Sequence, residues 1–452
     1  MQRLMLSEIA AACEGCLRGD DVPVSGVVID SRKAYTGALF VALKGERSDG
    51  HDFIDKAFEA GAAAALCSRA PENGGRCVLV RDTLAAYQAL SGWYRSRFDV
   101  NVLAVTGSVG KTTTKEFCHA VLSARYNTLK TEGNLNSDTG LPLMLFSLMP
   151  VHEAAVFEMG MSNAGEIGLL SRLARPRAAV ITNIGTSHIE SLKSRDNILR
   201  AKLEVQEGMP PDGVLVLNGD DDMLRSAAGI IRRPALWYGF GQGCDFAAED
   251  VSEDGDGTSF LVRCPSGVYP ARISAVGRHN VLNALAAVAA GFVMGVEPKR
   301  GAAALGDYAG LAMRQQIYLC GPVRIIEDCY NASPDSMRAA LSVLARHTAG
   351  RRIALLGDML ELGEHAEALH REVGRAAAES VDALVAYGTH SAALCDEAIR
   401  AGLDASRVFY EEKESAAERL ASLVKPGDTV LFKASRGMRA EDVLQEFRAA
   451  IT

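Results

Sequence analysis

The sequence has little of what a secreted, membrane-bound or nucleic-acid-binding protein needs. Its 10 cysteines are spread singly along 452 residues, without the dense spacing of a small disulfide-stapled domain. Asp and Glu (56) outnumber Lys and Arg (48), so the net charge of −8 leaves no excess of basic residues to neutralise nucleic-acid phosphates. We therefore expect reduced cysteines and no nucleic-acid partner.

Long apolar runs and a leader-like N-terminus are also missing. The opening MQRLMLSEIAAACEG has no sustained apolar core of the kind found in a signal peptide. The most apolar later stretch, residues 282–296, is interrupted by Gly291 and Gly295 and is too short to span a bilayer. Cys13 and Cys16 lack a second Cys or His pair to complete a zinc site. We expect a cytoplasmic protein with no membrane partner, and nothing in the sequence demands more than a monomer.

The pattern that is present divides the chain into three α/β segments. A chain of 452 residues is too long for one hydrophobic core. Apolar runs of strand length alternate with helical stretches throughout, which is typical of the α/β class. We predict a small N-terminal α/β domain over 1–98, a central domain with a mostly parallel sheet over 99–312, and a C-terminal Rossmann-like α/β domain over 313–452.

Two local patterns refine this outline. In the first segment, FIDKAFEAGAAAAL (53–66) follows two short strand-like runs and predicts a helix. In the central segment, the acidic, glycine-rich residues 245–271 interrupt the alternation and predict an antiparallel excursion.

A glycine-rich turn follows an apolar run in VLAVTGSVGKTTTKEF (102–117). Such a turn directs backbone N–H groups and the positive end of a helix dipole at one spot, and the lysine and hydroxyls there suit a polyphosphate with magnesium. Val105 stands where the ordinary P-loop has its first glycine, so this is a shorter form of the motif. A merely glycine-rich strand–turn–helix would not need the Lys-Thr pair. The candidate phosphate-binding residues are Thr106, Gly107, Ser108, Val109, Gly110, Lys111, Thr112 and Thr113.

Three further residues of the central segment are candidates for chemistry. Glu158 ends the run AAVFE and His188 follows AAVITNIGTS, which places both beyond the carboxyl ends of predicted parallel strands, where ligands bind. Glu158 suits a magnesium ligand, although a capping acid fits as well. A lone histidine such as His188 is often a structural hydrogen-bonding residue. Lys202, in the helical stretch ILRAKLEV, also fits a lysine whose stem covers apolar neighbours while its ammonium reaches water.

The C-terminal segment repeats the alternation without a second glycine-lysine loop. Arg314 stands at its start, where an arginine can reach across a cleft to a transferring phosphoryl group. Asp328, Asn331 and Asp335 surround a proline-containing turn and suit the same cleft, although ordinary turn residues have this composition too.

Taken together, the motifs resemble those of the Mur ligase family. TGSVGKTTTKE, EGNLNSDTG, FEMG, NIGTSHIE with AKLEV, and GRHNVLNALAA resemble, in this order, the family's ATP-binding segment. DSR followed by GALFVALKGERSDGHDFI resembles its uridine-nucleotide-binding domain. DCYNASPDSM, LGDMLELGE and KASRGMR are similar to the family member that takes a dipeptide acceptor. The resemblance extends from about residue 10 to residue 444.

The resemblance implies an enzyme of peptidoglycan precursor synthesis. It would use ATP and two magnesium ions to join D-alanyl-D-alanine to a UDP-N-acetylmuramoyl-tripeptide through an acyl phosphate. Lys111 would hold the β- and γ-phosphates, Thr112 and Glu158 one magnesium, and His188 the second. Lys202 would carry a carbamate that binds the second magnesium. Which of the adjacent threonine hydroxyls meets the metal stays open.

Further roles are implied by the same resemblance. Asn280 and Asn283 would lie on one side of a helix and contact adenine, Arg314 would approach the γ-phosphate, and Asp328 the ribose. The residues implied around the uridine diphosphate or sugar-peptide are Ser31, Arg32, Gly45, Asp49, His51 and Phe53, with Asn134 and Asn136 as weaker candidates for ligand contact. The residues implied on the acceptor side are Asn331, Asp335, Asp358, Lys433 and Ser435.

Three alternatives stay open at this point. A sister ligase that adds the third residue, or a folylpolyglutamate synthetase, would share the ATP-binding motifs but not DCYNASPDSM with LGDMLELGE. A P-loop switch or transport ATPase would hydrolyse ATP without an acyl acceptor, and the N-terminal segment argues against it. A nucleotide-sensing scaffold would have no need of Lys111, Glu158 and Lys202 together. The sequence does not distinguish a tripeptide ending in lysine from one ending in diaminopimelate.

Overall fold

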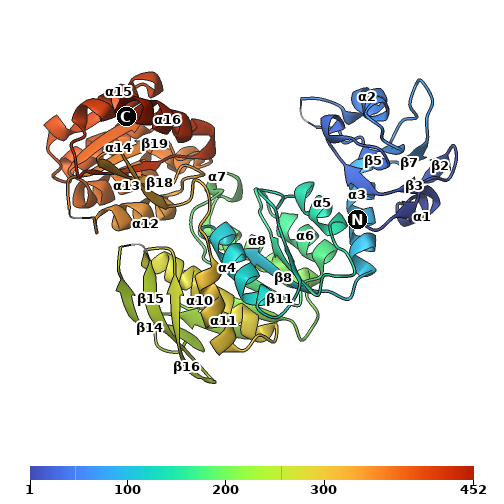
Figure 1. The fold of residues 1–452 in the computed structure, drawn as a ribbon, viewed down its shortest axis with the longest axis horizontal. Helices are drawn as coiled ribbons and strands as arrows, with labels where there is room; N and C mark the ends of the chain where they lie inside the picture. The colour runs from blue at the N-terminus through green and yellow to red at the C-terminus, as the bar shows by residue number, and fades with distance from the viewer. Residues whose placement is uncertain (46, 256, 348, 452) are drawn as a thin grey trace.

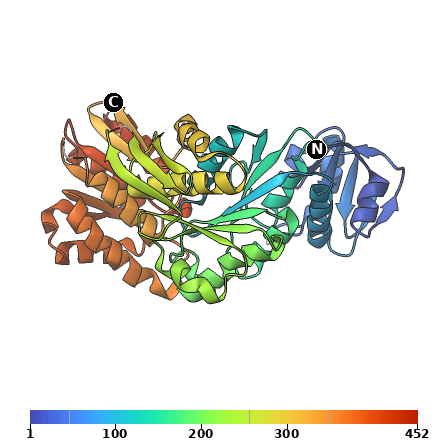
Figure 2. The same ribbon diagram turned by 90° about the horizontal axis from the view of Figure 1, so that it is seen from below.

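The computed structural model describes residues 1–45, 47–255, 257–347 and 349–451. Three larger sheets follow one another along the chain. The N-terminal part (blue) and the C-terminal part (orange to red) lie at opposite ends of the central part in both Figure 1 and Figure 2. The three sheets lie within the three predicted segments, and the α/β class is confirmed. Among the described residues, no helix is long and apolar enough to cross a membrane.

The N-terminal part has a five-stranded sheet in the order β2-β7-β6-β5-β4, parallel except between β2 and β7, and a separate β1–β3 pair. Its strands are β1 Leu4–Met5, β2 Cys16–Arg18, β3 Pro23–Val24, β4 Gly26–Val28, β5 Ala38–Val41, β6 Ala64–Cys67 and β7 Cys77–Leu79. Its helices are α1 Leu6–Ala12, α2 Ile54–Glu59 and α3 Thr83–Ser96.

The prediction of one helix over residues 53–66 is wrong. Helix α2 ends at Glu59, and Gly61 has a φ of 102°, which a helix does not contain. The alanines that follow form β6, which is buried along its whole length between neighbouring strands. Tertiary burial in the sheet therefore overrides the helix propensity of this alanine run.

The central part is a nine-stranded sheet in the order β16-β15-β14-β13-β12-β11-β8-β10-β9. The strands from β9 to β14 pair in parallel, whereas β14, β15 and β16 pair antiparallel, which confirms the predicted excursion. These strands are β8 Asn101–Thr106, β9 Thr128–Lys130, β10 Ala154–Glu158, β11 Ala178–Ile181, β12 Val214–Asn218, β13 Ala235–Gly239, β14 Phe246–Glu253, β15 Thr258–Cys264 and β16 Gly267–Ile273.

Helices cover both faces of the central sheet, which explains why its strands are nearly continuous apolar runs. Helices α4 and α10 cover one face, and α3, α5, α6 and α8 cover the other. The helices of this part are α4 Lys111–Ser123, α5 Gly140–Phe146, α6 Glu166–Ala174, α7 Ile189–Leu192, α8 Arg195–Leu203, α9 Asp222–Ser226, α10 Arg278–Val293 and α11 Pro298–Ala304.

The C-terminal part is a six-stranded sheet in the order β17-β18-β22-β19-β20-β21, parallel except for β17. Its strands are β17 Gln316–Cys320, β18 Val323–Glu327, β19 Arg352–Gly357, β20 Ala383–Tyr387, β21 Val408–Glu411 and β22 Thr429–Lys433. Its helices, packed on both faces, are α12 Pro334–Leu344, α13 Ala366–Ser380, α14 Ser391–Arg400, α15 Lys413–Leu423 and α16 Ala440–Ile451.

Candidate functional site

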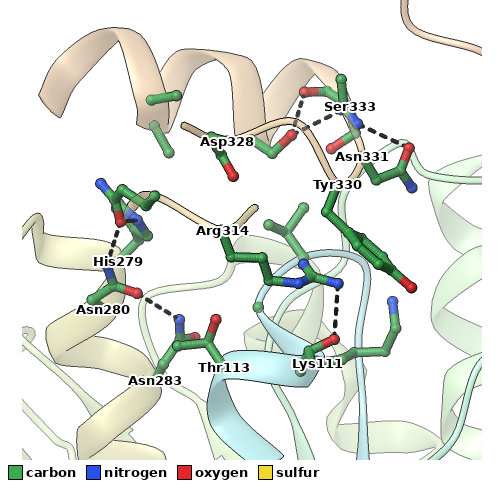
Figure 3. Close-up of a pocket in the computed structure, with 18 of the residues that line it drawn as sticks. Lys111, Thr113, His279, Asn280, Asn283, Arg314, Asp328, Tyr330, Asn331 and Ser333 are labelled. Carbon is green, nitrogen blue, oxygen red and sulfur yellow. Dashed lines mark hydrogen bonds between the residues drawn. The ribbon is translucent and has the colours of Figure 1, made fainter. Parts of the chain in front are cut away.

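A cavity of about 640 Å³ lies between the central and C-terminal parts. The central part contributes the loop 108–113, the start of α10, the end of β10, and Ser187 and His188 in the loop after β11. The C-terminal side contributes the linker around Arg314 and the loop 328–333 (Figure 3). The cavity thus lies beyond the carboxyl ends of the parallel strands, which is the ligand-binding edge of such sheets.

The phosphate loop joins β8 to α4 as predicted. Gly107 (φ 142°) and Gly110 (φ 87°) have left-handed backbones, and a Cβ on Gly110 would lie 2.6 Å from Oδ1 of Asn283. Only glycine therefore fits there. Thr106 is buried and donates to the carbonyl of Met159 at 2.9 Å, so it supports the loop from beneath. Residues 108–113 line the cavity, and α4 begins at Lys111.

Lys111 folds back over its own loop. Its Nζ donates to the carbonyl oxygens of Gly107 at 2.9 Å and Ser108 at 3.3 Å. Burial holds the pKa of Lys111 below its ordinary value, and the negative charge of Glu158 opposes that shift. The ammonium is therefore already at the loop that would receive a phosphate.

Glu158 is almost fully buried at the end of β10, where its backbone N–H donates to Oγ1 of Thr131 at 2.9 Å. Its Oε1 accepts from Nδ2 of Asn136 at 2.8 Å, while its buried Oε2 has no hydrogen-bond partner among the described residues. An unpaired buried carboxylate oxygen is costly unless a cation satisfies it. Glu158 therefore fits a magnesium ligand.

The same described part of the chain contains no group of three or more His, Cys, Asp or Glu that could hold a metal ion. Magnesium does not require such a cage, because it is usually bound through one or two carboxylates together with substrate phosphates and water. The donors near the phosphate loop, Glu158 and the Thr112 hydroxyl, suit that arrangement.

His188 connects the central part to the C-terminal part. Its Nδ1 lies 2.7 Å from Oε2 of Glu361, and its backbone is left-handed, with a φ of 64°. The hydrogen bond from His188 holds the pKa of Glu361 below its ordinary value. His188 lines the cavity as predicted, but in this structure its ring is paired with a residue that was not among the predicted site residues.

Lys202 lies in α8 with only 1% of its surface exposed. Burial, together with the positive charge of Lys111, holds its pKa well below the ordinary lysine value. The alternative of a lysine with its ammonium in water is therefore wrong. Lys202 does not line the cavity itself, so its predicted carbamate stays a prediction.

Asn280 and Asn283 lie on one side of α10, as predicted, and their side chains are linked by a 3.4 Å hydrogen bond. Nδ2 of Asn280 also donates to Oε1 of Gln315 at 2.6 Å, and the ring of His279 lies 3.2 Å from the same oxygen. This polar group lines one end of the cavity (Figure 3). Burial lowers the pKa of His279, so its ring is held neutral there.

Arg314 reaches the phosphate loop from the linker between the two sheets. Its Nη2 donates to Oγ1 of Thr112 at 3.0 Å, and its guanidinium lies 4.1 Å from the ring centroid of Tyr330 (Figure 3). The cation–π contact orients the guanidinium across the cavity. Tyr330 was not predicted as a site residue.

Lys433, an acceptor-side candidate, contacts two other predicted site residues, Asp328 and Asn331. Lys433 is buried, forms an ion pair with Asp328 and donates to the carbonyl of Asn331 at 3.1 Å. Asp328, Asn331 and Lys433 all line the cavity. Their contacts with ribose or dipeptide stay predictions.

Three other acceptor-side candidates lie outside the cavity lining. Asp358 accepts from Oγ of Ser391 at 2.7 Å, and Ser435 donates to the carbonyl of Ala332 at 3.2 Å, so both hold loops of the C-terminal part together. Asp335 pairs with Arg338 at the start of α12. Asn134 also lies outside the lining, whereas Asn136 lies in it.

The predicted uridine-side residues all lie in the N-terminal part, away from this cavity lining. Asp49 accepts from the backbone N–H of His51 at 3.0 Å and lies 2.6 Å from its Nδ1, while Nε2 of His51 accepts from the N–H of Ser68 at 2.9 Å. These contacts stabilise the loop. Ser31, Arg32, Gly45, Asp49, His51 and Phe53 stay predicted ligand contacts.

Comparisons with known proteins agree with this geometry. Residues 23–86 match the family model for the catalytic domain of the Mur ligase family, residues 105–291 the Mur ligase middle domain, and residues 313–436 the glutamate ligase domain of Mur ligases. The chain is 41% identical to the UDP-N-acetylmuramoyl-tripeptide–D-alanyl-D-alanine ligase of Bacillus subtilis (strain 168), over 99% of this chain and 98% of that protein.

Solved structures of Mur ligases are also similar to this one. The structure is similar to a crystal structure of MurF from Acinetobacter baumannii, with a TM-score of 0.93 and 32% identity over 99% of both chains. It is also similar to MurF from Thermotoga maritima in complex with ADP, with a TM-score of 0.84 and 30% identity over 95% of this chain and 98% of that one. By sequence over nearly its whole length and by structure, the chain belongs to the Mur ligase family.

Proposed function

We propose that this chain is an ATP-dependent ligase that adds D-alanyl-D-alanine to UDP-N-acetylmuramoyl-tripeptide during peptidoglycan precursor synthesis in the cytoplasm. The observation that carries the proposal is the convergence of Lys111, the unpaired oxygen of Glu158, and Arg314 on one cavity between two domains. The full-length similarity to the B. subtilis dipeptide-adding ligase identifies the substrates.

The reaction needs ATP because a free carboxylate is a poor acyl donor. Transfer of the γ-phosphoryl group to the terminal carboxylate of the tripeptide gives an acyl phosphate, whose phosphate is a good leaving group. The amine of the dipeptide then attacks the acyl carbon, and the tetrahedral intermediate collapses to the amide and phosphate. No protein nucleophile is required.

Phosphoryl transfer brings two anions together, so positive groups must offset their repulsion. Lys111 and Arg314 supply two positive charges at the phosphate loop, one bonded to the carbonyl of Gly107 and the other to the hydroxyl of Thr112. The first N–H groups of α4 have no partner within the helix, and with the helix dipole they favour the β- and γ-phosphates.

Glu158 and Thr112 would hold one magnesium ion, and His188 and Lys202 a second. Bound magnesium would neutralise charge on the transferring phosphoryl group. We further propose that Lys202 is carbamylated. Its depressed pKa favours the neutral amine that adds to CO₂, and the resulting carbamate would offset the positive charge of Lys111.

Acyl phosphates hydrolyse readily, so the domains must exclude water around the reacting groups. The cavity already has one wall from the central part and one from the C-terminal part. We propose domain boundaries near residues 98 and 312, a tripeptide site on the N-terminal domain, an acceptor site on the C-terminal domain, and a monomeric enzyme.

Phosphate release with a panel of acceptors tests the proposed function. With ATP, magnesium and the UDP-sugar tripeptide, D-alanyl-D-alanine should release phosphate fastest. L-Alanyl-L-alanine and free D-alanine should be slower by about 100-fold, because a misplacement near 1 Å costs that much. Fast addition of a free diamino acid to a UDP-sugar dipeptide would instead identify a sister ligase, and equal hydrolysis without any acceptor would identify a simple ATPase.

A further inference from the structure

Glu361 has no role in the mechanism described so far, although it lies at the junction of the two halves of the site. It belongs to the loop that follows β19, at the carboxyl edge of the C-terminal sheet where ligands of parallel sheets bind. Its Oε2 is 2.7 Å from Nδ1 of His188 in the central part. Its side chain is 62% exposed, so the carboxylate has room for a second partner.

The loop that carries Glu361 is held firmly. The backbone N–H of Leu360 donates to Oγ of Ser435 at 2.9 Å, which ties the loop to the end of β22. A Cβ on Gly363 would lie 2.9 Å from Cγ of Glu190, so the loop closely approaches α7. Figure 1 shows α7 next to the C-terminal part. The position of the carboxylate is therefore set by both domains.

Glu361 and His188 face each other with unusual backbones. Their φ values are 63° and 64°, in the left-handed region that non-glycine residues seldom adopt. Such conformations are maintained where surrounding structure enforces them and are concentrated at functional sites. Two of them on opposite sides of one inter-domain contact indicate a placement that matters for the reaction.

The charge on Glu361 itself is what suits a cation. Glu361 is close enough to Lys111 for their charges to influence each other, so it lies near the phosphate-transfer centre. His188 is its ion-pair partner in this structure. If His188 turns to a magnesium ion, as the proposed function requires, Glu361 loses that partner and presents an ionised carboxylate beside His188, which lines the cavity.

We propose that Glu361 anchors the ammonium group of the incoming acceptor dipeptide and so determines acceptor affinity. This inference rests on the proposed function, in which the acceptor binds to the C-terminal domain. The carboxylate binds the ammonium form through a charge-assisted hydrogen bond and takes no part in bond formation. To attack the acyl carbon, the amine must leave this anchor and give its extra proton to solvent water.

The test separates acceptor binding from donor activation. Hydroxylamine is a small neutral nucleophile that intercepts an acyl phosphate as a hydroxamate without needing an ammonium anchor. In Glu361→Gln, the KM for D-alanyl-D-alanine should rise about 10- to 100-fold, the range expected for a lost hydrogen bond to a charged group. The rate of hydroxamate formation from ATP and the UDP-sugar tripeptide should stay within about two-fold of the wild-type rate.

Two further variants complete the design. Glu361→Asp keeps the charge on a shorter side chain and should give a KM between those of the wild type and the glutamine variant. Glu364→Gln is the matched control. Glu364 is exposed and lies three residues after Glu361, so this variant should behave as the wild type.

Two results would overturn the proposal. An unchanged KM for the dipeptide in Glu361→Gln would show that the carboxylate does not meet the acceptor. A parallel fall of hydroxamate and amide formation would show that Glu361 acts only by orienting His188. Failure of the proposed function is distinguishable, because it would appear already in the wild type as no dipeptide-dependent turnover, with or without hydroxamate.

Discussion

Arg314 and Thr112 are joined by a 3.0 Å hydrogen bond, although they belong to different parts of the chain. Thr112 is the second residue of α4, directly after the phosphate-loop lysine, and Arg314 lies in the linker before the C-terminal sheet. The contact places a guanidinium, stacked on Tyr330, over the loop that would hold the γ-phosphate. The linker therefore lines the cavity that we propose to be the ATP site.

Arg314→Ala should lower kcat by about 1,000-fold, by analogy with arginines that stabilise phosphoryl-transfer transition states. Arg314→Lys should recover little, because an ammonium neither stacks on Tyr330 nor donates as a planar fork. Tyr330→Phe, which keeps the ring, serves as the control and should stay near wild-type activity. Steady-state phosphate release measures all three, and a fully active lysine variant would show that only net charge matters.

Lys111→Ala should abolish ATP-dependent turnover while the N-terminal domain still binds the UDP-sugar tripeptide. The reason is spatial, since Lys111 lies at the central cavity and the predicted uridine-side residues lie in another domain. Calorimetry with the UDP-sugar tripeptide and phosphate release with ATP give the two readouts. Equal loss of both would mean that the loop supports folding or a shared site.

Lys202→Arg should be as inactive as Lys202→Ala, because a guanidinium keeps a positive charge but does not form a carbamate. Arginine is also larger than lysine and Lys202 is buried, so thermal unfolding must be checked in both variants. Small carboxylic acids should partly restore the alanine variant by replacing the carbamate. Wild-type activity in the arginine variant, measured with excess ATP and acceptor, would exclude carbamylation.

His279 should make the protein more sensitive to acid. Burial lowers its pKa in the folded protein, whereas in the unfolded chain it titrates near its ordinary value of about 6.5. Below that value the unfolded chain takes up a proton that the folded protein resists, so stability falls as the pH falls towards the folded pKa. The wild type should therefore lose more thermal stability than His279→Gln between about pH 7 and pH 5, and equal losses in both would contradict this account.

The sequence predicted best what depends on local pattern. The strand–glycine loop–helix unit around Lys111 follows from residue spacing, whereas the placement of Asn280 and Asn283 on one helix face was implied by the resemblance to the family. The antiparallel pairing of β14, β15 and β16 was likewise predicted, because residues 245–271 interrupt the alternation of strands and helices. The alanine-rich run after Gly61 was misread because the strand conformation of Ala64–Cys67 depends on burial between neighbouring strands.

The residues that sequence reasoning missed are defined by long-range pairing. Glu361 meets His188 across two domains, and Tyr330 meets Arg314 through the fold of the linker. His279 and Gln315 meet at the cavity although 36 positions separate them. Each stands inside or beside a motif that was already singled out, but a motif does not show which of its side chains turns towards a partner in another domain.

The most direct test of the central claim follows one oxygen atom. The tripeptide substrate is labelled with heavy oxygen in its terminal carboxylate and incubated with the enzyme, ATP, magnesium and D-alanyl-D-alanine, and the released phosphate is analysed by mass spectrometry. Activation through an acyl phosphate predicts one labelled oxygen in the phosphate for each amide formed. Unlabelled phosphate released alongside the amide product would contradict that account.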